Sequence, residues 1–182
     1  MNIAFIDGTP TGLPTPFDTY AHCQMRIPES SHAVHHLMLR DMTISPCTGC
    51  FGCWTKTPGR CLSQDDTHQI CTSYMSSDVV LFASPVLCGF TSALLKTAQD
   101  KLIPLLHPYF ETVKGEVHHR RRYTQYPKIA LLLDRGMDAD QEDIDIITQI
   151  YHRMALNLKT RLVFVGDTGH TPEEVAHGIA AH

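Results

Sequence analysis

The chain has 182 residues, of which 43% are hydrophobic and 19% charged, and its formal net charge is −4. This length suits one domain that buries its own core, so we expect residues 1–182 to form a single domain. The acidic balance argues against nucleic-acid binding, and no apolar run reaches membrane-spanning length. Seven cysteines without a recognisable signal peptide indicate reduced thiols or metal ligands in the cytoplasm, and not a disulfide framework.

The amino-terminal part begins with a short apolar run at residues 2–6, which predicts a first strand. The loop that follows, residues 7–16, contains three prolines and three threonines. A short helix is expected over residues 17–26 and a second strand over residues 33–39. We assign no metal site to the twelve histidines of the chain.

A cysteine-rich loop follows the second predicted strand. Cys47, Cys50 and Cys53 are spaced by two residues each, and Cys61 follows after seven more. Overlapping Cys-x-x-Cys spacing in a tight loop brings side chains together. We therefore expect the four sulfur atoms to face a common point. Free thiols that serve only as small packing residues are the alternative.

The middle of the chain alternates between helix and strand signals. A capping-box pattern at residues 63–66 predicts a helix that runs to about residue 76. Residues 78–84 form a continuous apolar run, as expected of a central parallel strand buried on both faces. Residues 84–90 are expected to form a loop at its carboxyl end. A helix from Thr91 follows, and two prolines end or bend it.

The carboxyl-terminal part repeats the same alternation. Residues 107–126 carry no clear period and are expected to be irregular, and residues 128–133 read as another buried strand. Residues 140–159 form the best helical pattern of the chain, acidic at the start and with one apolar stripe. Residues 161–165 suit a last strand, and Thr171 is expected to cap a short terminal helix.

This order of elements predicts an α/β fold with helices on both faces of a parallel sheet. Five strands favour the flavodoxin-like strand order 2-1-3-4-5, in which ligands bind at the carboxyl ends of strands 1 and 3. Loops 7–16, 84–90 and 134–139 would meet at that edge. Because the cysteine loop follows the second strand, we expect it to open on the same edge.

Two motifs resemble a known enzyme family. The segment from Ser84 to Lys101 is similar to the Ser-Pro-x-Tyr-x-Gly…Ser-x-x-x-Lys-x-x-x-Asp-Arg signature of the NAD(P)H-dependent flavin mononucleotide (FMN) reductases. Upstream, Cys-x-Gly-Cys-x-x-Cys-Trp, Pro-Gly-x-Cys and an Asp-Asp pair resemble the cysteine-containing branch of that group, which includes the iron–sulfur flavoproteins. The resemblance covers residues 2–165.

The resemblance implies FMN, with NAD(P)H as co-substrate. The phosphate of FMN would lie in the first loop, where Thr9, Thr11 and Thr15 would add hydroxyl donors to the backbone N–H groups. The flavin ring would lie against the following residues of loop 84–90: Ser84, Pro85, Val86, Leu87, Gly89 and Phe90. The first loop departs from the family pattern, because it has no basic residue and its prolines remove three N–H donors. A rigid surface loop is the alternative.

The resemblance gives the cysteine loop a second interpretation. In iron–sulfur flavoproteins, cysteines at this compact spacing ligate a 4Fe–4S cluster, and the corresponding residues here are Cys47, Cys50, Cys53 and Cys61. Zinc and free or redox-active thiols remain open. On the neighbouring helix, Lys96, Asp100 and Lys101 are read as an i,i+4 ion pair and a solvated face.

Three functions follow as hypotheses. The first is an FMN-dependent NAD(P)H oxidoreductase that passes electrons to a flavin, quinone or similar acceptor; since the flavin carries the chemistry, we assign no catalytic residue. The second is an electron-transfer iron–sulfur flavoprotein whose partner is a redox protein. The third is a degenerate fold that has lost its cofactor. The resemblance also implies a homodimer or homotetramer.

Overall fold

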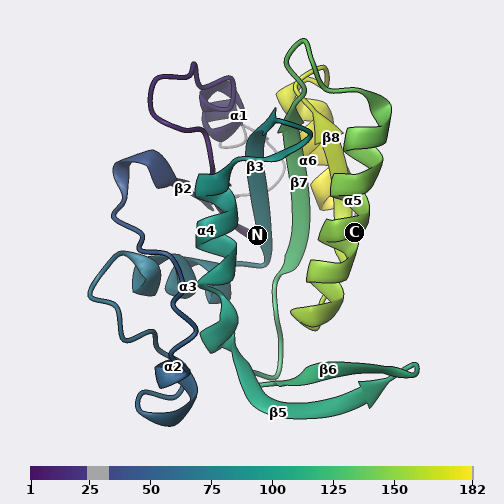
Figure 1. Cartoon of the computed structure of the whole chain (residues 1–182). Coiled ribbons are helices and arrows are strands. Elements are labelled where there is room, and N and C mark those ends of the chain that lie inside the picture. Colours follow the sequence, from purple (N-terminus) through teal and green to yellow (C-terminus); the bar gives the residue numbers. More distant parts are fainter. Residues whose placement is uncertain (24–32, 182) are drawn as a thin grey trace.

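The computed structural model describes residues 1–23 and 33–181, and it shows a central sheet with helices on both faces (Figure 1). Five strands are parallel and stand in the order β2-β1-β3-β7-β8, which confirms the predicted flavodoxin-like order 2-1-3-4-5. Their bounds are Asn2–Asp7 for β1, Ala33–Met38 for β2, Val79–Leu87 for β3, Lys128–Asp134 for β7 and Leu162–Asp167 for β8. A short sixth strand, β4 (Phe90–Thr91), pairs antiparallel with β3.

The helices separate into two layers, each closing one apolar core. The helices α3 (Thr67–Met75), α4 (Ala93–Asp100) and α5 (Gln141–Asn157) cover one face of the sheet. The helices α1 (Asp18–Cys23) and α6 (Pro172–Ala180) cover the other. The remaining helical segments are short: η2 Leu39–Asp41, α2 Gly52–Thr55 and η3 Ile103–Leu105.

The strand β3 is the centre of the sheet. Its first seven residues are buried, as the continuous apolar run predicts, because helices cover both of its faces. Phe82 is 1% exposed and packs edge-on against Tyr151 of α5, with ring centroids 5.9 Å apart. This aromatic pair packs α5, the 17-residue helix Gln141–Asn157, against the middle of the sheet.

Residues 107–126, expected to be irregular, contain a second sheet, so that prediction is wrong. The strands β5 (Leu106–Val113) and β6 (Glu116–Arg121) pair antiparallel and extend from one end of the domain (Figure 1). Lys114 and Gly115 both have positive φ, of 50° and 82°, which is the backbone of a tight two-residue hairpin turn. The hairpin is mostly exposed, so it lacks the apolar alternation that identifies a half-buried strand.

Several predicted boundaries shift for local reasons. The helix predicted from residue 63 begins at Thr67, because the side chains of Asp65 and Asp66 instead accept hydrogen bonds from the backbone of Ser45 and Thr43. The helix predicted over residues 17–26 is α1, and its last three predicted residues lie outside the described residues. The capping predicted at Thr171 is confirmed.

No helix within residues 1–23 and 33–181 is both long and apolar enough to cross a membrane.

Candidate functional site

The helix α4 connects two candidate sites at opposite ends of the sheet. At its amino end the N-cap Ser92 donates its hydroxyl to the carbonyl of Gly8, at the start of the first loop. At its carboxyl end Lys101 contacts the cysteine loop. The eight residues of α4 rise by about 12 Å. The expectation that the cysteine loop opens on the flavin edge is therefore wrong.

The segment after β2 explains this displacement. The 3-10 helix η2 packs against α4. Farther along the chain, the backbone N–H of Asp66 donates to the carbonyl of Thr43, and the backbone N–H of Thr43 donates to the carboxylate of Asp66. These contacts carry the chain along α4 to the far end, where α2 lies beside the β5–β6 hairpin (Figure 1). The indole N–H of Trp54 donates to the carbonyl of Leu106 at 2.9 Å and fixes α2 there.

All four cysteines line one cavity of about 260 Å³, and the convergence of their sulfur atoms on one point stays a prediction. Cys47 and Cys50 are exposed, Cys61 is half-buried and Cys53 is buried. Left-handed backbone at Gly49 (φ 66°) and Phe51 (φ 55°) turns the loop tightly. The remaining lining residues that matter here are Trp54, Ser63 and Lys101.

Lys101 supplies a buried positive charge to this cavity, and the predicted solvated face is wrong at this residue. Its side chain is 2% exposed; the Nζ atom lies 3.4 Å from Oδ2 of Asp65 and donates a hydrogen bond of 2.8 Å to Oγ of Ser63. The same Ser63 oxygen lies 3.5 Å from Sγ of Cys61. The predicted i,i+4 pair between Lys96 and Asp100 is present and exposed. Lys101, which directly follows α4, therefore points into the cavity, whereas Lys96, within α4, is exposed to solvent.

The surroundings of the cysteines shift the pKa values of their thiols in opposite directions. Burial works against ionisation of Cys61, but the hydrogen bond with Ser63 and the nearby Lys101 ammonium outweigh it and lower the pKa of this thiol. Burial raises the pKa of Cys53, and the neighbouring cysteines add to the effect. Burial likewise raises the pKa of Cys71 to about 12. Since the thiolate is the reactive and ligating form, Cys61 is the most reactive of these three.

The cysteine donor set is of a kind that both iron–sulfur clusters and structural zinc ions use. Four thiolates are the usual ligand set of such clusters. In a tetrahedral zinc site with Zn–S bonds of about 2.3 Å, the sulfur atoms lie about 3.8 Å apart. Among residues 1–23 and 33–181, no three cysteines have sulfur atoms within 4.8 Å of one another. The cysteine sulfur atoms are therefore not gathered as closely as they are around a single zinc ion.

The predicted phosphate loop, by contrast, does not fit a phosphate through its threonines. The hydroxyl of Thr9 is buried and donates to Oδ1 of Asp7 at 2.6 Å. The hydroxyl of Thr15 donates to Oδ2 of Asp18 at 2.5 Å. Thr11 is exposed and Thr15 is half-buried, so only Thr11 has a fully exposed side chain among the three. Two carboxylates next to the loop disfavour a further anion.

The predicted ring-binding segment is a hairpin, and not the loop expected over residues 84–90. Ser84, Pro85, Val86 and Leu87 continue β3, and Phe90 belongs to β4. The turn consists of Cys88 and Gly89, with φ of 52° and 75°.

The hairpin is fixed from the side of the sheet. The Ser92 backbone N–H donates to the buried hydroxyl oxygen of Ser84. A Cβ atom on Gly89 would lie 2.7 Å from Oδ1 of Asp143, so this glycine faces the start of α5 and not an open ring site. Phe90 is half-buried against the core, whereas Leu87 is 38% exposed. Val86 is half-buried against the same core as Phe90, so Leu87 is the better candidate for apolar contact with a ring.

Sequence reasoning missed Lys101 and Asp65 as part of the cysteine site, although both lie in the motifs that carry the resemblance. Their partnership depends on the path of residues 39–66 along α4, which no local pattern encodes. It also missed a group formed by Asp7, Asp18 and His36, which come from three different elements.

Comparisons with known proteins agree with this fold. The family model described as NADPH-dependent FMN reductase matches residues 1–123. An iron–sulfur flavoprotein of Archaeoglobus fulgidus is 33% identical over 87 residues, which are 48% of this chain and 38% of that protein. An iron–sulfur flavoprotein of Methanocaldococcus jannaschii is 34% identical over 79 residues, 43% of this chain and 40% of that protein. The matched part thus spans about two-fifths of the length of these curated relatives.

Solved structures with the same fold are more distant in sequence. Azoreductase AzrA superposes with a TM-score of 0.61 at 16% identity, covering 100% of this chain and 94% of that one. An FMN-dependent NADH-azoreductase of Bacillus anthracis, solved in complex with FMN, gives a TM-score of 0.60 at 12% identity, covering 99% and 94%. At these identities the likeness shows the fold alone.

Proposed function

The chain belongs to the NADPH-dependent FMN reductase family, and on that premise we propose that it passes electrons from NAD(P)H through FMN to a flavin, quinone or similar small acceptor. The observation that carries the proposal is the family match over residues 1–123, which includes the sheet edge where flavodoxin-like folds bind ligands.

In this proposal the hairpin positions the flavin. Leu87 offers an exposed apolar contact at the carboxyl end of β3, next to the half-buried Val86. Ser84 and Ser92 hold the hairpin and the amino end of α4 together, so this surface is rigid before a ligand arrives. Bound FMN would supply the hydride and electron chemistry, and the protein supplies position and electrostatics.

The first loop, where the phosphate of FMN would lie, contributes less binding energy than a loop whose hydroxyl groups are free to donate to the phosphate. Thr9 and Thr15 are bonded to Asp7 and Asp18, so the binding energy of FMN rests mainly on its ring. This explains how the family function and an unusual first loop occur in one chain.

The test is anaerobic mixing of the FMN-loaded protein with NADPH and, separately, NADH. We expect rapid bleaching of the flavin absorbance with one of them, followed by return of the colour when a quinone is added. Protein that takes up no FMN, or bound FMN that neither nucleotide bleaches, would contradict the proposal.

We also expect a cytoplasmic protein that forms a homodimer or homotetramer. Light scattering of the purified protein measures the mass of this assembly.

The cysteine cavity favours a second candidate function, an electron carrier that holds both FMN and a 4Fe–4S cluster. Cys47, Cys50, Cys53 and Cys61 would hold the cluster, and the Lys101 ammonium would offset part of the negative charge of four thiolates. Such a carrier would exchange electrons with a redox protein such as a ferredoxin.

Iron and acid-labile sulfide, measured on protein made and purified without oxygen, distinguish the two candidates. The carrier requires about four irons per chain, lost in Cys50→Ser and retained in Cys88→Ser, because Cys88 lies in the β3–β4 turn outside the cavity. Absent iron with titratable thiols in the loop leaves the reductase with a cysteine-rich loop.

A further inference from the structure

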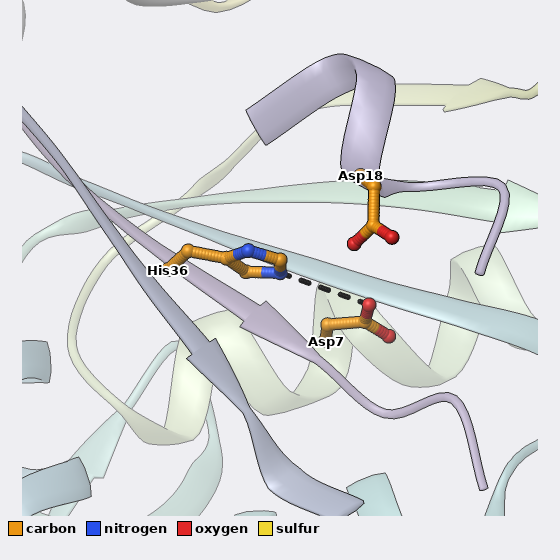
Figure 2. A group of neighbouring side chains, drawn as sticks. All are labelled: Asp7, Asp18 and His36. Carbon is orange, nitrogen blue, oxygen red and sulfur yellow. Dashed lines mark ion pairs between the residues drawn. The ribbon is translucent and has the colours of Figure 1, made fainter. Parts of the chain in front are cut away.

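Three polar side chains from different elements converge in one place (Figure 2). They lie on the face of the sheet that α1 and α6 cover. Asp7 ends β1, His36 lies in β2 and Asp18 begins α1. Parallel pairing places Phe5 beside His36 and Asp7 two residues farther along the same face. The start of α1 then brings the Asp18 carboxylate toward both (Figure 2).

The geometry of this group is that of a compact donor set. One oxygen of each aspartate and one ring nitrogen of His36 all lie within 4.8 Å of one another. The Nε2 atom of His36 lies 3.7 Å from Oδ2 of Asp7, which is too long for a hydrogen bond. The three atoms therefore surround a small space with no hydrogen bond across it, and the dashed line in Figure 2 marks the ion pair that Asp7 forms with a protonated His36.

Two of these atoms are buried and have no hydrogen-bond partner in the part of the chain that the structure describes. Asp7 is 2% exposed; its Oδ1 accepts two hydrogen bonds from Thr9, whereas its Oδ2 accepts none. The Nε2 atom of His36 is equally unpartnered. Buried polar atoms are nearly always satisfied, so an orphaned carboxylate oxygen that faces an orphaned imidazole nitrogen requires an explanation.

We propose that Asp7, Asp18 and His36 bind one divalent first-row transition-metal ion. Two carboxylates and an imidazole suit Mn²⁺, Fe²⁺ or Zn²⁺. The ion satisfies both orphaned atoms, and its charge cancels that of the two carboxylates. Ligand bonds of about 2.0–2.2 Å place neighbouring donors about 3.0–3.5 Å apart, so the 3.7 Å separation of Asp7 and His36 needs only a small contraction.

The groups around the three donors orient them as the surroundings of metal ligands usually do. Thr9 holds the bonded oxygen of Asp7, and Thr15 holds one oxygen of Asp18. The ring of Phe5 packs edge-on against His36, with centroids 5.0 Å apart, and fixes the plane of the imidazole.

The competing explanation is an ion pair in which a protonated His36 sits between the two carboxylates and no metal binds. The two explanations differ in whether added metal binds saturably to these residues. Mn²⁺ is the suitable probe, because it prefers carboxylate and imidazole donors and has little affinity for the soft thiolates of the cysteine cavity.

The experiment is a titration of metal-free protein with Mn²⁺. Binding is measured as the decrease in the electron spin resonance signal of free Mn²⁺. We expect one site per chain, at least tenfold weakened in Asp18→Asn and in His36→Gln. His35→Gln is the matched control, because His35 is an exposed neighbour in the same strand, and Cys50→Ser controls for the thiols. Both controls should bind Mn²⁺ as the wild type does, and Zn²⁺ should displace the bound Mn²⁺.

A thermal readout separates binding from folding defects. Saturating Mn²⁺ should raise the Tm of the wild type and of both controls, and leave the Tm of folded Asp18→Asn and His36→Gln unchanged. No saturable binding to the wild type would overturn the proposal. Wild-type affinity in both Asp18→Asn and His36→Gln would overturn it as well.

Discussion

The two ends of α4 carry opposite chemistry on one rigid frame. At the amino end, the first loop lies between two carboxylates, Asp7 and Asp18, which engage its threonines. At the carboxyl end, four cysteines surround a cavity into which Lys101 projects its charge. The sheet and α4 fix where each site lies, whereas loop residues set its charge.

The comparison of the two ends shows that the fold determines where a ligand can bind, whereas the residues at that place determine which ligand it can be. The family fold places a ligand edge at the carboxyl ends of the strands. The residues present there favour an apolar ring over a phosphate, and the strongest electrostatic organisation lies at the other end. Each end of α4 can therefore be tested by substitutions that do not touch the other end.

The largest expected effect concerns the frame that both ends share. Replacing Phe82 by Ala removes a side chain that is 1% exposed in the central strand and should cost about 3–5 kcal/mol of unfolding free energy through the cavity left behind. Urea denaturation measures it, with Leu87→Ala as an exposed control expected to change stability by less than about 1 kcal/mol. A loss below about 1 kcal/mol in Phe82→Ala would mean that β3 is not the central strand.

Lys101→Met tests the cysteine end. The change leaves Asp65 without its cation and should cost about 2–3 kcal/mol, since the pair is almost fully enclosed. It should also raise the pKa of Cys61, so alkylation of this thiol, followed by mass spectrometry, should shift to higher pH. Lys96→Met is the control, because the exposed pair of Lys96 with Asp100 contributes only about 0.5 kcal/mol. Equal effects of the two substitutions would show that the cavity does not depend on Lys101.

A smaller effect is expected from acid. Hydrogen bonds from Thr67 and Ser45 and the charge of Lys101 outweigh burial and lower the pKa of Asp65 from 3.8 to about 2. The unfolded chain therefore binds a proton first as the pH falls. The stabilisation by this carboxylate is complete above about pH 4 and disappears toward pH 2. We expect its size to be about 2 kcal/mol, because the pair of this carboxylate with Lys101 is almost fully enclosed.

The acid effect is measured by urea denaturation at pH 5, 3 and 2, values that bracket the titration from 3.8 to about 2. Asp65→Asn should lose less stability over this range than the wild type, whereas Asp100→Asn, at an exposed position, should follow the wild type. An unchanged slope in Asp65→Asn would contradict the assignment.

The smallest effect is expected at the first loop. If Thr9 and Thr15 are occupied by carboxylates, the phosphate of FMN gains little there, and riboflavin should bind nearly as tightly as FMN. We expect the two dissociation constants, measured in the presence of a chelator, to differ by less than about tenfold, or about 1.4 kcal/mol. A preference for FMN of several hundredfold would show that the loop does grip the phosphate.

The sequence was sufficient to predict the strand order and the grouping of the four cysteines around one cavity, and insufficient to predict how the two ends of α4 are built. Buried runs such as residues 78–84 and the stripe of α5 are dictated by local period, so they were predictable. The position of Lys101 depends on the path of a long connection along α4, and the β5–β6 hairpin is too exposed to show apolar alternation. The group of Asp7, Asp18 and His36 depends on strand register, which no short motif contains.

The most direct test of the central claim, that flavin binds at the hairpin and away from the cysteine cavity, is an FMN titration of two single variants. Leu87→Glu places a charge on the exposed hairpin, and Cys50→Ser alters the cavity. We predict that FMN binding, followed by flavin fluorescence, weakens at least about tenfold in Leu87→Glu, which is about 1.4 kcal/mol, and is unchanged in Cys50→Ser. Weaker binding in Cys50→Ser with wild-type binding in Leu87→Glu would contradict the account and place the flavin at the cysteine end.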